Sequence, residues 1–278
     1  MSTPNTPSST AAGLPQYEVF AIRYATRGGK RANHFLGGDP HDAPMPMDYY
    51  LWLIRGNGRT VVVDTGFGRE VAQRRGRTLL RLPAEGLALL DVEAAAVKDV
   101  VITHLHYDHV GTFDAFAGAR FHLQDDEMAY ATGRYMCHRQ FNHGYEVEEV
   151  IGMVRLVYKD RVDFHRGDAE LAPGITLHRI GGHTHGLQCV RVHTARGWVV
   201  LASDASHFYE HFEKKRVFTT MFNVGEAVDG YGTLLRLADS PQHVIPGHDP
   251  LVMQRYPAPN PALEGVVARL DVQPQNAA

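Results

Sequence analysis

The sequence lacks several features that would mark a special class of protein. It has two cysteines, Cys137 and Cys189, which form no C-x-x-C pair and are too few for a disulfide framework. No run of roughly 18 apolar residues is present, and the beginning, MSTPNTPSSTAAGLP, has neither the basic start nor the apolar core of a secretory signal. We therefore expect a cytoplasmic protein with free thiols and no membrane span.

Basic residues are also too few and too dispersed to suit a nucleic-acid surface. The formal net charge is -3, and the one Arg-rich run, REVAQRRGRTLLRL (Arg69 to Leu82), is interpreted as a solvated helix face rather than a polyanion site. We therefore expect a small molecule as the partner, with no nucleic acid and no membrane. A homodimer is a further possibility, because a loose N-terminal arm could embrace a second subunit.

Length and composition predict one globular domain. The chain has 278 residues, of which 44% are hydrophobic and 21% charged, and a chain of this size can bury a substantial core. The Ser, Thr and Pro content of residues 1–16 predicts a disordered arm, and residues 271–278 look like a loose tail. The domain itself is expected to span residues 17–270.

Short apolar strands separated by turns dominate the pattern. The segments Tyr50–Arg55 and Thr60–Gly66 flank the turn sequence GNG and predict a hairpin. The apolar run Asp99–His104 predicts a buried strand. Helical spacing is present in residues 91–99, 125–133, 147–158 and 230–240. Because hairpins argue against a purely parallel sheet, we expect an α/β fold of two mixed sheets packed together, with helices outside.

The stretch THLHYDHVG, Thr103 to Gly111, crowds three histidines and an aspartate into the end of a predicted strand. Titratable groups cost free energy when they are buried without partners, and a metal ion is the simplest partner. Alternate residues of an extended backbone share a face, so His104 and His106 can reach one ion. Asp108 and His109, beyond the bend, can reach a second. Such ligands suit zinc, with manganese, iron or cobalt as alternatives.

Three later strand ends offer the ligands that two ions still need. His183 follows a Gly-Gly bend, Asp204 ends the apolar run WVVLAS, and His248 follows a Pro-Gly turn. An aspartate between two cations can bridge them, with one oxygen to each. The predicted ligand set, with Asp204 shared, is His104, His106 and His183 for one ion and Asp108, His109 and His248 for the other.

Two cations at this spacing would make water a nucleophile near neutral pH. A single zinc lowers the pKa of bound water from about 15.7 to about 7, so hydroxide bridging the two ions could attack a substrate carbonyl. Asp108 or a bound water could then return the proton to the leaving group. No Ser-His-Asp arrangement is evident, and this chemistry requires none.

The sequence resembles the metallo-β-lactamase superfamily in the order of its motifs. These motifs are H-x-H-x-D-H, a distant His, an Asp at a strand end and a late G-H. The turn DTG at Asp64 is similar to a further motif, in which the Asp supports the metal site by holding a ligand histidine. The resemblance covers Tyr17 to Val266. It implies an αβ/βα sandwich of two mixed sheets with helices outside and a dinuclear site along one edge of the sheets.

Within that superfamily the chain is most similar to the N-acyl-homoserine lactonase group, on the segments THLHYDHVG, GGHTHGL and SDA. The resemblance implies a metal-dependent hydrolase that opens an acyl-homoserine lactone or a related lactone. One departure is evident: these lactonases commonly carry a Tyr three residues after the bridging Asp, where this chain has His207. Either His207 donates the same hydrogen bond to the substrate carbonyl, or Tyr209 does so from a shifted loop.

Substrate choice must depend on residues outside these motifs. The candidates come from the Pro- and Met-rich stretch His41–Tyr50, the position after the DTG turn, and the insertion Tyr135–Glu146. The residues expected to contact an apolar substituent are Met47, Tyr49, Phe67, Phe141 and Tyr145. Ordinary core packing is the alternative interpretation for each.

Other functions fit the same ligand set. A thioesterase of the glyoxalase II type, or another ester hydrolase, is the main alternative, and a β-lactamase or a tRNA-processing phosphodiesterase fits less well. A metal-bearing sensor without catalytic activity is a third class, against which the complete ligand set argues.

Overall fold

The computed structural model describes residues 13–275, so most of the predicted N-terminal arm (1–12) and the last three positions of the predicted tail (276–278) lie outside the described residues. Residues 271–275 are held against the domain rather than loose. The Asp271 carboxylate accepts a hydrogen bond from the Val19 backbone N–H at 3.3 Å, and the Gln275 N–H donates to the Arg255 carbonyl at 2.7 Å. Within the described residues, no helix is long and apolar enough to cross a bilayer.

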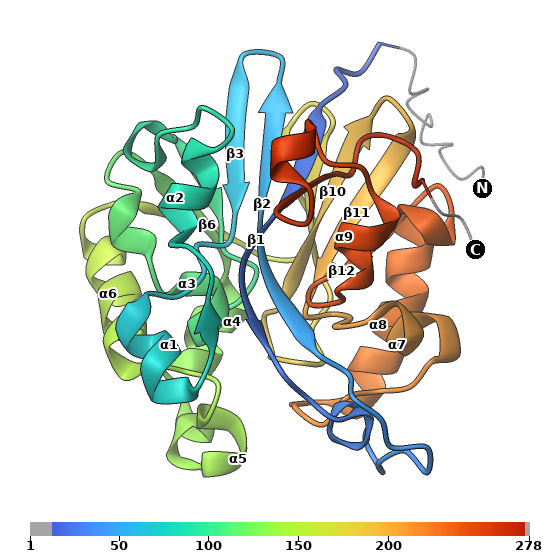
Figure 1. Cartoon of the computed structure of the whole chain (residues 1–278). Coiled ribbons are helices and arrows are strands. Elements are labelled where there is room, and N and C mark those ends of the chain that lie inside the picture. Colours follow the sequence, from blue (N-terminus) through green and yellow to red (C-terminus); the bar gives the residue numbers. More distant parts are fainter. Residues whose placement is uncertain (1–12, 276–278) are drawn as a thin grey trace, which may run out of the picture.

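Two mixed sheets form the centre of the molecule (Figure 1). The first runs in the order β13 (Val267–Arg269), β1 (Glu18–Arg27), β2 (Met47–Gly56), β3 (Arg59–Val63), β5 (Asp99–Val101), β6 (Arg120–Gln124) and β7 (Val162–His165), with β4 (Thr78–Leu79) also paired to β1. The second runs in the order β12 (Val244–Pro246), β11 (Gly197–Ser203), β10 (Gln188–Thr194), β9 (Ile175–Arg179) and β8 (Ala169–Ala172). Each sheet contains parallel and antiparallel neighbours, as the hairpin signals predicted.

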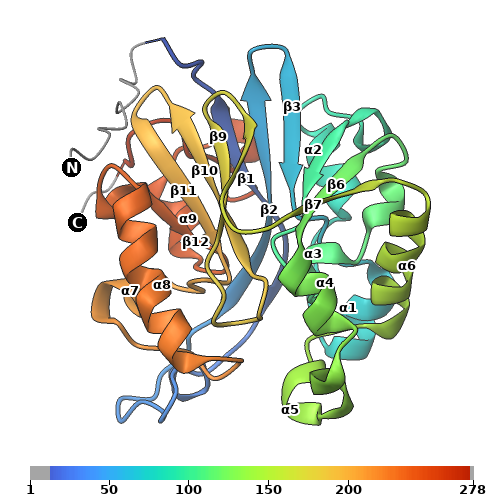
Figure 2. The ribbon, with the colours of Figure 1, turned by 180° about the vertical axis from the view of Figure 1, so that it is seen from behind.

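Helices cover the outer faces of both sheets, which gives the predicted αβ/βα order of layers (Figures 1 and 2). On the side of the first sheet lie α1 (Arg69–Arg75), α2 (Pro83–Ala88), α3 (Tyr107–Val110), α4 (Asp125–Ala131), α5 (Arg139–Asn142) and α6 (Val147–Tyr158). On the side of the second sheet lie α7 (Tyr209–Lys214), α8 (Val224–Leu237) and α9 (Leu251–Arg255).

Most local predictions are confirmed. β2 and β3 form the predicted hairpin, in which Asn57 and Gly58 adopt positive φ values of 49° and 70°, as a tight primed turn requires. The helix predicted over residues 91–99 is wrong. Asp91 takes a left-handed φ of 58° and the chain is extended again at Val97, so only a short 3-10 turn at Ala94–Ala96 forms before β5.

Strand β1 is apolar almost throughout because both of its faces are buried. Val19 and Ala21 face the second sheet and belong to the core between the sheets, whereas Phe20 and Ile22 belong to the core under the first sheet's helices. Successive side chains of a strand point to opposite faces, so a strand inside a layered fold needs apolar residues at consecutive positions. The first sheet therefore contributes side chains to both cores.

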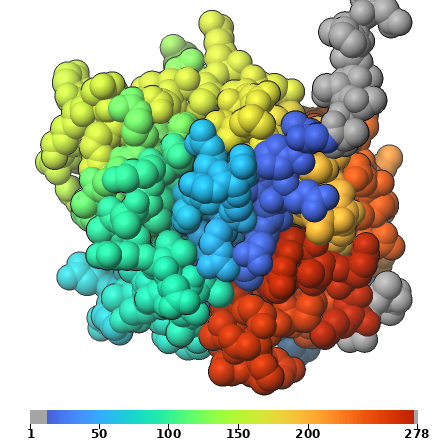
Figure 3. Space-filling model, turned by 90° about the horizontal axis from the view of Figure 1, so that it is seen from above, coloured from blue at the N-terminus to red at the C-terminus, as the bar shows by residue number. Residues whose placement is uncertain are grey.

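The lower end of the molecule in Figure 1 carries the connections that project beyond the sheets. The β1–β2 connection, residues 28–46, and α5 both project from the lower end in Figure 1. From above, Figure 3 shows the early strands, in blue and cyan, between green segments on one side and orange and red segments on the other. Strands β3, β5 and β11 end within the fold toward the lower end, where the motif residues follow them.

The core between the sheets supplies a test of this layering. Leu201 of β11 is 1% exposed in that core, whereas Leu89 is 44% exposed. We expect Leu201→Ala to lower the free energy of unfolding by about 2–5 kcal/mol, and Leu89→Ala by less than about 0.5 kcal/mol. Urea unfolding followed by circular dichroism measures both. Equal losses in the two variants would contradict the assignment of Leu201 to the core.

Candidate metal centre

Thr103, two residues after the end of β5, joins the ends of three strands by hydrogen bonds. Its hydroxyl donates to Asp64 Oδ2 at 2.9 Å and lies 2.8 Å from the hydroxyl of Ser203. Asp64 follows β3 of the same sheet, but Ser203 ends β11 of the second sheet. Asp64 and Ser203 adopt left-handed φ values of 63° and 47°, which few non-glycine residues do. These bonds hold both residues in that conformation and join the edges of the two sheets.

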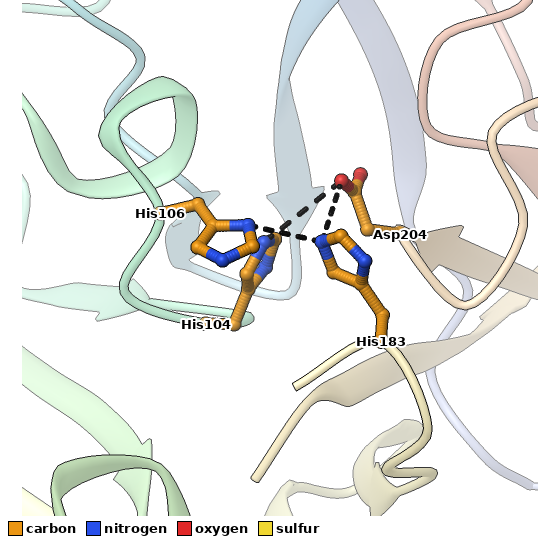
Figure 4. A group of neighbouring side chains, drawn as sticks. All are labelled: His104, His106, His183 and Asp204. Atoms are coloured by element: carbon orange, nitrogen blue, oxygen red, sulfur yellow. Dashed lines mark hydrogen bonds and ion pairs between the residues drawn. The ribbon is translucent and has the colours of Figure 1, made fainter. Parts of the chain in front are cut away.

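The first group of ligand atoms combines His104, His106, His183 and Asp204, all buried (Figure 4). His183 Nε2 lies 3.0 Å from His106 Nδ1 and 3.3 Å from Asp204 Oδ2. His104 Nε2 lies 3.9 Å from the same oxygen. One ligand atom from each of the four residues falls within 4.8 Å of the others, which is a spacing that a single ion can span.

The second group combines Asp108, His109 and His248, also buried. Nε2 of His109 and Nε2 of His248 lie 3.7 and 3.6 Å from Asp108 Oδ2. The same two nitrogens lie 3.3 and 3.0 Å from Asp204 Oδ1. Asp204 therefore presents one oxygen to each group, and the structure brings together all seven predicted ligands in the predicted partition.

Three of the imidazole rings are oriented by hydrogen bonds at Nδ1, the ring nitrogen that faces away from the ligand groups. His109 Nδ1 donates to Asp64 Oδ2 at 2.7 Å, as expected for Asp64. His183 Nδ1 donates to the Thr220 carbonyl at 2.6 Å, and His248 Nδ1 donates to the Asp48 carbonyl at 2.8 Å. Each bond fixes the tautomer that leaves Nε2 with a lone pair facing the site.

The electrostatics of the first group favour neutral histidine ligands beside an ionised aspartate, whereas in the second group the nearby carboxylates, Asp204 above all, outweigh burial and raise the pKa of His109 and His248. Burial lowers the pKa of His104 and His106 well below its ordinary value, and neighbouring imidazoles lower it further. Burial alone would raise the pKa of Asp204, but His248, His207 and His109 hold it well below its usual range. Neutral imidazoles and an ionised carboxylate are the forms that bind cations.

Three atoms at the centre are buried without a hydrogen-bond partner among the described residues: His104 Nε2, His109 Nε2 and Asp204 Oδ1. Each points into one of the two groups, and unpartnered buried polar atoms are costly. Cation ligation would satisfy all three. The residues therefore fit a pair of divalent metal ions, held by three histidines on one side, by two histidines and Asp108 on the other, and by Asp204 between them.

A cavity of about 180 Å³ adjoins both groups, and Asp108 and His207 line it. His207 Nε2 lies 2.9 Å from Asp204 Oδ2, and its ring stacks on Phe218 with centroids 3.6 Å apart. Tyr209 is turned away, because its backbone N–H donates to Asp249 and its buried ring borders a separate cavity. This position corrects the expectation that Tyr209 could reach a substrate carbonyl.

Of the residues expected to contact substrate, Met47 and Tyr49 line the cavity, whereas the other three do not. Phe67 is fully buried behind Tyr49, with ring centroids 5.3 Å apart, and supports that wall from within the core. Its apolar character reflects packing, the alternative that the sequence left open.

The insertion after the first motif is placed differently from the expectation. Tyr145 is buried, and its ring packs against His106 with centroids 4.6 Å apart, so it supports a ligand rather than a substrate. Phe141 packs against Tyr135 and Phe222 outside the cavity lining. Gly144 of the same insertion does line the cavity, and a Cβ there would meet His106 Nε2 at 2.5 Å, so glycine is required.

Two kinds of site residue were missed by reasoning from the sequence. Arg75 and Arg77 line the cavity, although their run was interpreted as a solvated helix face, and Arg27 joins them from the end of β1. The αL residue Gly76 ends α1 between the two arginines and turns the chain toward the site. No periodicity in the sequence distinguishes these arginines from exposed ones.

The other residue that the sequence did not reveal is Glu127 of α4, a fully buried carboxylate that holds the ligand loops by hydrogen bonds. Its Oε1 accepts hydrogen bonds from the Leu105 N–H at 2.9 Å and the Tyr145 hydroxyl at 2.9 Å. Its Oε2 accepts from the Thr184 hydroxyl at 2.7 Å and the Gly186 N–H at 3.1 Å. Leu105 lies between two ligands and Thr184 follows a third, so one carboxylate holds both loops.

Comparisons with known proteins agree with this geometry. The family model described as the metallo-beta-lactamase superfamily matches residues 46–248, well over half of the chain. The N-acyl homoserine lactonase AiiB of Rhizobium rhizogenes is 31% identical over 174 residues, which span 56% of this chain and 62% of that protein. An N-acyl homoserine lactonase of Bacillus cereus is 32% identical over 184 residues, 61% of this chain and 68% of that protein.

Solved structures show the same fold. A quorum-quenching N-acyl homoserine lactone lactonase superposes with a TM-score of 0.70 at 21% identity, covering 85% of this chain and 93% of the other. The hydrolase AbOPH of the beta lactamase superfamily superposes with a TM-score of 0.69 at 15% identity, covering 96% of this chain and all of the other. The predicted αβ/βα sandwich is thereby confirmed.

The four hydrogen bonds to Glu127 generate a prediction for metal binding. Glu127→Gln replaces one acceptor oxygen by an amide NH₂ group, which would face hydrogen-bond donors of the ligand loops. We therefore expect metal affinity to fall by about 10–100-fold, as it does when other groups that orient metal ligands are changed. Titration with a competing chelator measures the affinity. Glu148→Gln, at an exposed position of α6, is the matched control and should bind metal as the wild type does. Unchanged affinity in Glu127→Gln would show that the ligand loops do not need this carboxylate.

Proposed function

This chain belongs to the metallo-beta-lactamase superfamily, and from that premise we propose that it hydrolyses the ring ester of small-molecule lactones. In this reaction one water adds to the carbonyl carbon, the ring C–O bond breaks, and a hydroxy acid forms. The observation that carries the proposal is the complete set of seven buried ligands beside a cavity, with Asp204 shared between the two groups. The names of the relatives from Rhizobium rhizogenes and Bacillus cereus support the ester of a lactone as the bond cleaved.

Zinc is the proposed metal, because five imidazoles and two carboxylates form a donor set of intermediate softness. When bound, such ions supply Lewis acidity that makes water a nucleophile near neutral pH and polarises a carbonyl. The seven predicted ligands would hold the ions, and Asp64 and the carbonyls of Thr220 and Asp48 orient three of these side chains by hydrogen bonds.

His207 is the proposed donor to the oxygen that gains charge as the carbonyl is attacked. Its ring lines the cavity and stacks on Phe218, and Nε2 lies 2.9 Å from Asp204 Oδ2, so the proposed N–H at Nε2 is shared between Asp204 and a substrate oxygen bound in the cavity. A donor held in place before the reaction stabilises the developing oxyanion without reorganising. Burial lowers the pKa of His207 well below its ordinary value, which favours a neutral ring that donates through one nitrogen.

Asp108 is the proposed carrier of the proton to the leaving alcohol. Its carboxylate lines the cavity, and its Oδ2 faces the rings of His109 and His248. The other oxygen is then available to accept a proton from water and return it to the alkoxide, within reach of the same bound substrate.

A panel assay tests the proposed function. Metal-reconstituted protein is offered acyl-homoserine lactones, simple γ-lactones, ring-fused aromatic lactones, a thioester, a β-lactam and a phosphodiester, with acid release followed by a pH indicator. We expect turnover of at least one lactone class, loss of that turnover on dialysis against a chelator, and recovery with zinc. Turnover confined to the thioester would instead assign the chain to the glyoxalase II type of hydrolase.

Substitution of His207 tests its role as a donor. We expect His207→Phe to lower kcat by about 10²–10³-fold with metal content unchanged, because one oxyanion donor is lost while the stack on Phe218 can be kept. His207→Gln retains an N–H donor and should recover part of the rate. Metal analysis and steady-state kinetics on the best lactone measure both variants. A rate for His207→Phe within twofold of wild type would remove His207 from the mechanism.

A further inference from the structure

Three arginines line the small cavity beside the metal ligands, and they differ in how their charge is balanced. Arg75 is neutralised by Glu146, with Nε to Oε1 at 2.7 Å. Arg27 and Arg77 form no ion pair with any carboxylate among residues 13–275. Partly buried guanidinium groups without a counter-charge are unusual, because a buried charge needs a partner.

The contacts of Arg27 and Arg77 leave part of their hydrogen-bonding capacity unused. Arg27 Nη2 contacts only the weak acceptor Sδ of Met47, at 2.8 Å. Arg77 Nε donates to the Tyr107 hydroxyl at 2.9 Å, and its Nη1 donates to the Arg75 carbonyl at 2.7 Å. A guanidinium carries five N–H donors in a fork that matches the oxygens of an anion.

Arg27 and Arg77 line the same small cavity, together with Tyr49 and Tyr107. The Tyr49 hydroxyl lies 3.3 Å from that of Tyr107, which is the acceptor for Arg77. The two arginines and the two tyrosine hydroxyls therefore make the lining of this cavity rich in donors.

The charge balance of the cavity favours an anionic ligand. The carboxylates that line it are Asp108 and Asp204, and both are metal ligands in the proposed centre. Two divalent cations outweigh these two carboxylates, so the loaded cavity is positive even before the arginines are counted. An anion that meets both guanidinium groups gains charge-assisted hydrogen bonds in a region sheltered from water.

The cavity beside the predicted ligands is small, which favours a compact substrate. Its volume is about 180 Å³, below the ~300–1,000 Å³ typical of sites for drug-sized ligands. A lactone ring with one small substituent suits this volume better than a ring with a long acyl chain.

We propose, on the basis of the lactonase function above, that the substrate is a compact lactone bearing a carboxylate, which Arg27 and Arg77 bind while the ring ester faces the metal ligands. The neutral N-acyl homoserine lactones named for the relatives are then poorer substrates for this chain. Specificity for an anion is set by residues from the end of β1 and the α1–β4 connection, outside the ligand motifs.

Matched substrate pairs test the proposal in the full-length, zinc-loaded protein. γ-Butyrolactones with a carboxylate at each of the three substitutable ring carbons are compared with the corresponding carboxamides, which have the same shape and no charge. We expect at least one carboxylate to exceed its carboxamide by about tenfold or more in kcat/KM, mainly through KM, and the ratio to shrink as salt is added. Ratios below about threefold at all three positions would overturn the proposal and leave the lactonase function standing.

Charge-removing variants identify the groups responsible. Arg27→Gln and Arg77→Gln should each bring the ratio of carboxylate to carboxamide toward one, with metal content unchanged. Arg69→Gln is the matched control, because Arg69 lies on α1 with a side chain that is 71% exposed and away from the cavity. A ratio that persists in both cavity variants would assign Arg27 and Arg77 a purely structural role.

A binding measurement separates this proposal from the proposed function. Glutarate and its monoamide are titrated into the zinc-loaded protein by calorimetry, without any turnover. We expect the wild type to bind glutarate about tenfold more tightly than the monoamide. This preference should be reduced in Arg27→Gln and Arg77→Gln but not in Arg69→Gln. Such a result supports the anion site even if no lactone is hydrolysed. Equal binding of the two ligands in all four proteins would overturn it even if neutral lactones are good substrates.

Discussion

The buried carboxylate of Asp204 is the point on which the structure depends. It lies between rings on both sides, with His183 and His207 at Oδ2 and His109 and His248 at Oδ1. An ionised carboxylate is costly to bury unless its charges and lone pairs are matched, so the ends of β5, β11 and β12 have to meet around it. The face-to-face packing of the two sheets brings these strand ends together, so both sheets deliver side chains to the same carboxylate.

That arrangement is held by polar residues behind the ligands. Thr103 joins Asp64 on one sheet to Ser203 on the other, and Glu127 joins the first ligand loop to the loop of His183. Left-handed backbone at Asp64 and Ser203 costs free energy that these hydrogen bonds offset. The rigid frame therefore consists of satisfied buried donors and acceptors, which fix ligand geometry more closely than apolar packing does.

The proposed substrate specificity depends on a different part of the molecule from the proposed metal centre. The proposed metal ligands follow strand ends in the middle of the fold, whereas Arg27, Tyr49 and Arg77 of the donor-rich lining come from β1, β2 and the α1–β4 connection. Connections of this kind can change without disturbing the ligand set. A fold shared with lactonases is therefore compatible with a substrate that differs from theirs in charge and size.

Strand periodicity and residue type are local properties that a single chain displays, so the sequence sufficed to predict the fold class and to single out the seven ligand candidates that the structure brings together. The DTG turn likewise pointed to Asp64, although its partner His109 lies 45 residues further along the chain. The folded structure was needed to show that Phe67 and Tyr145 pack behind the site, that Tyr209 faces elsewhere, and that two arginines of a run interpreted as solvated line the cavity. The direction of a side chain and the absence of a counter-charge depend on neighbours distant in the chain, and no local pattern encodes them.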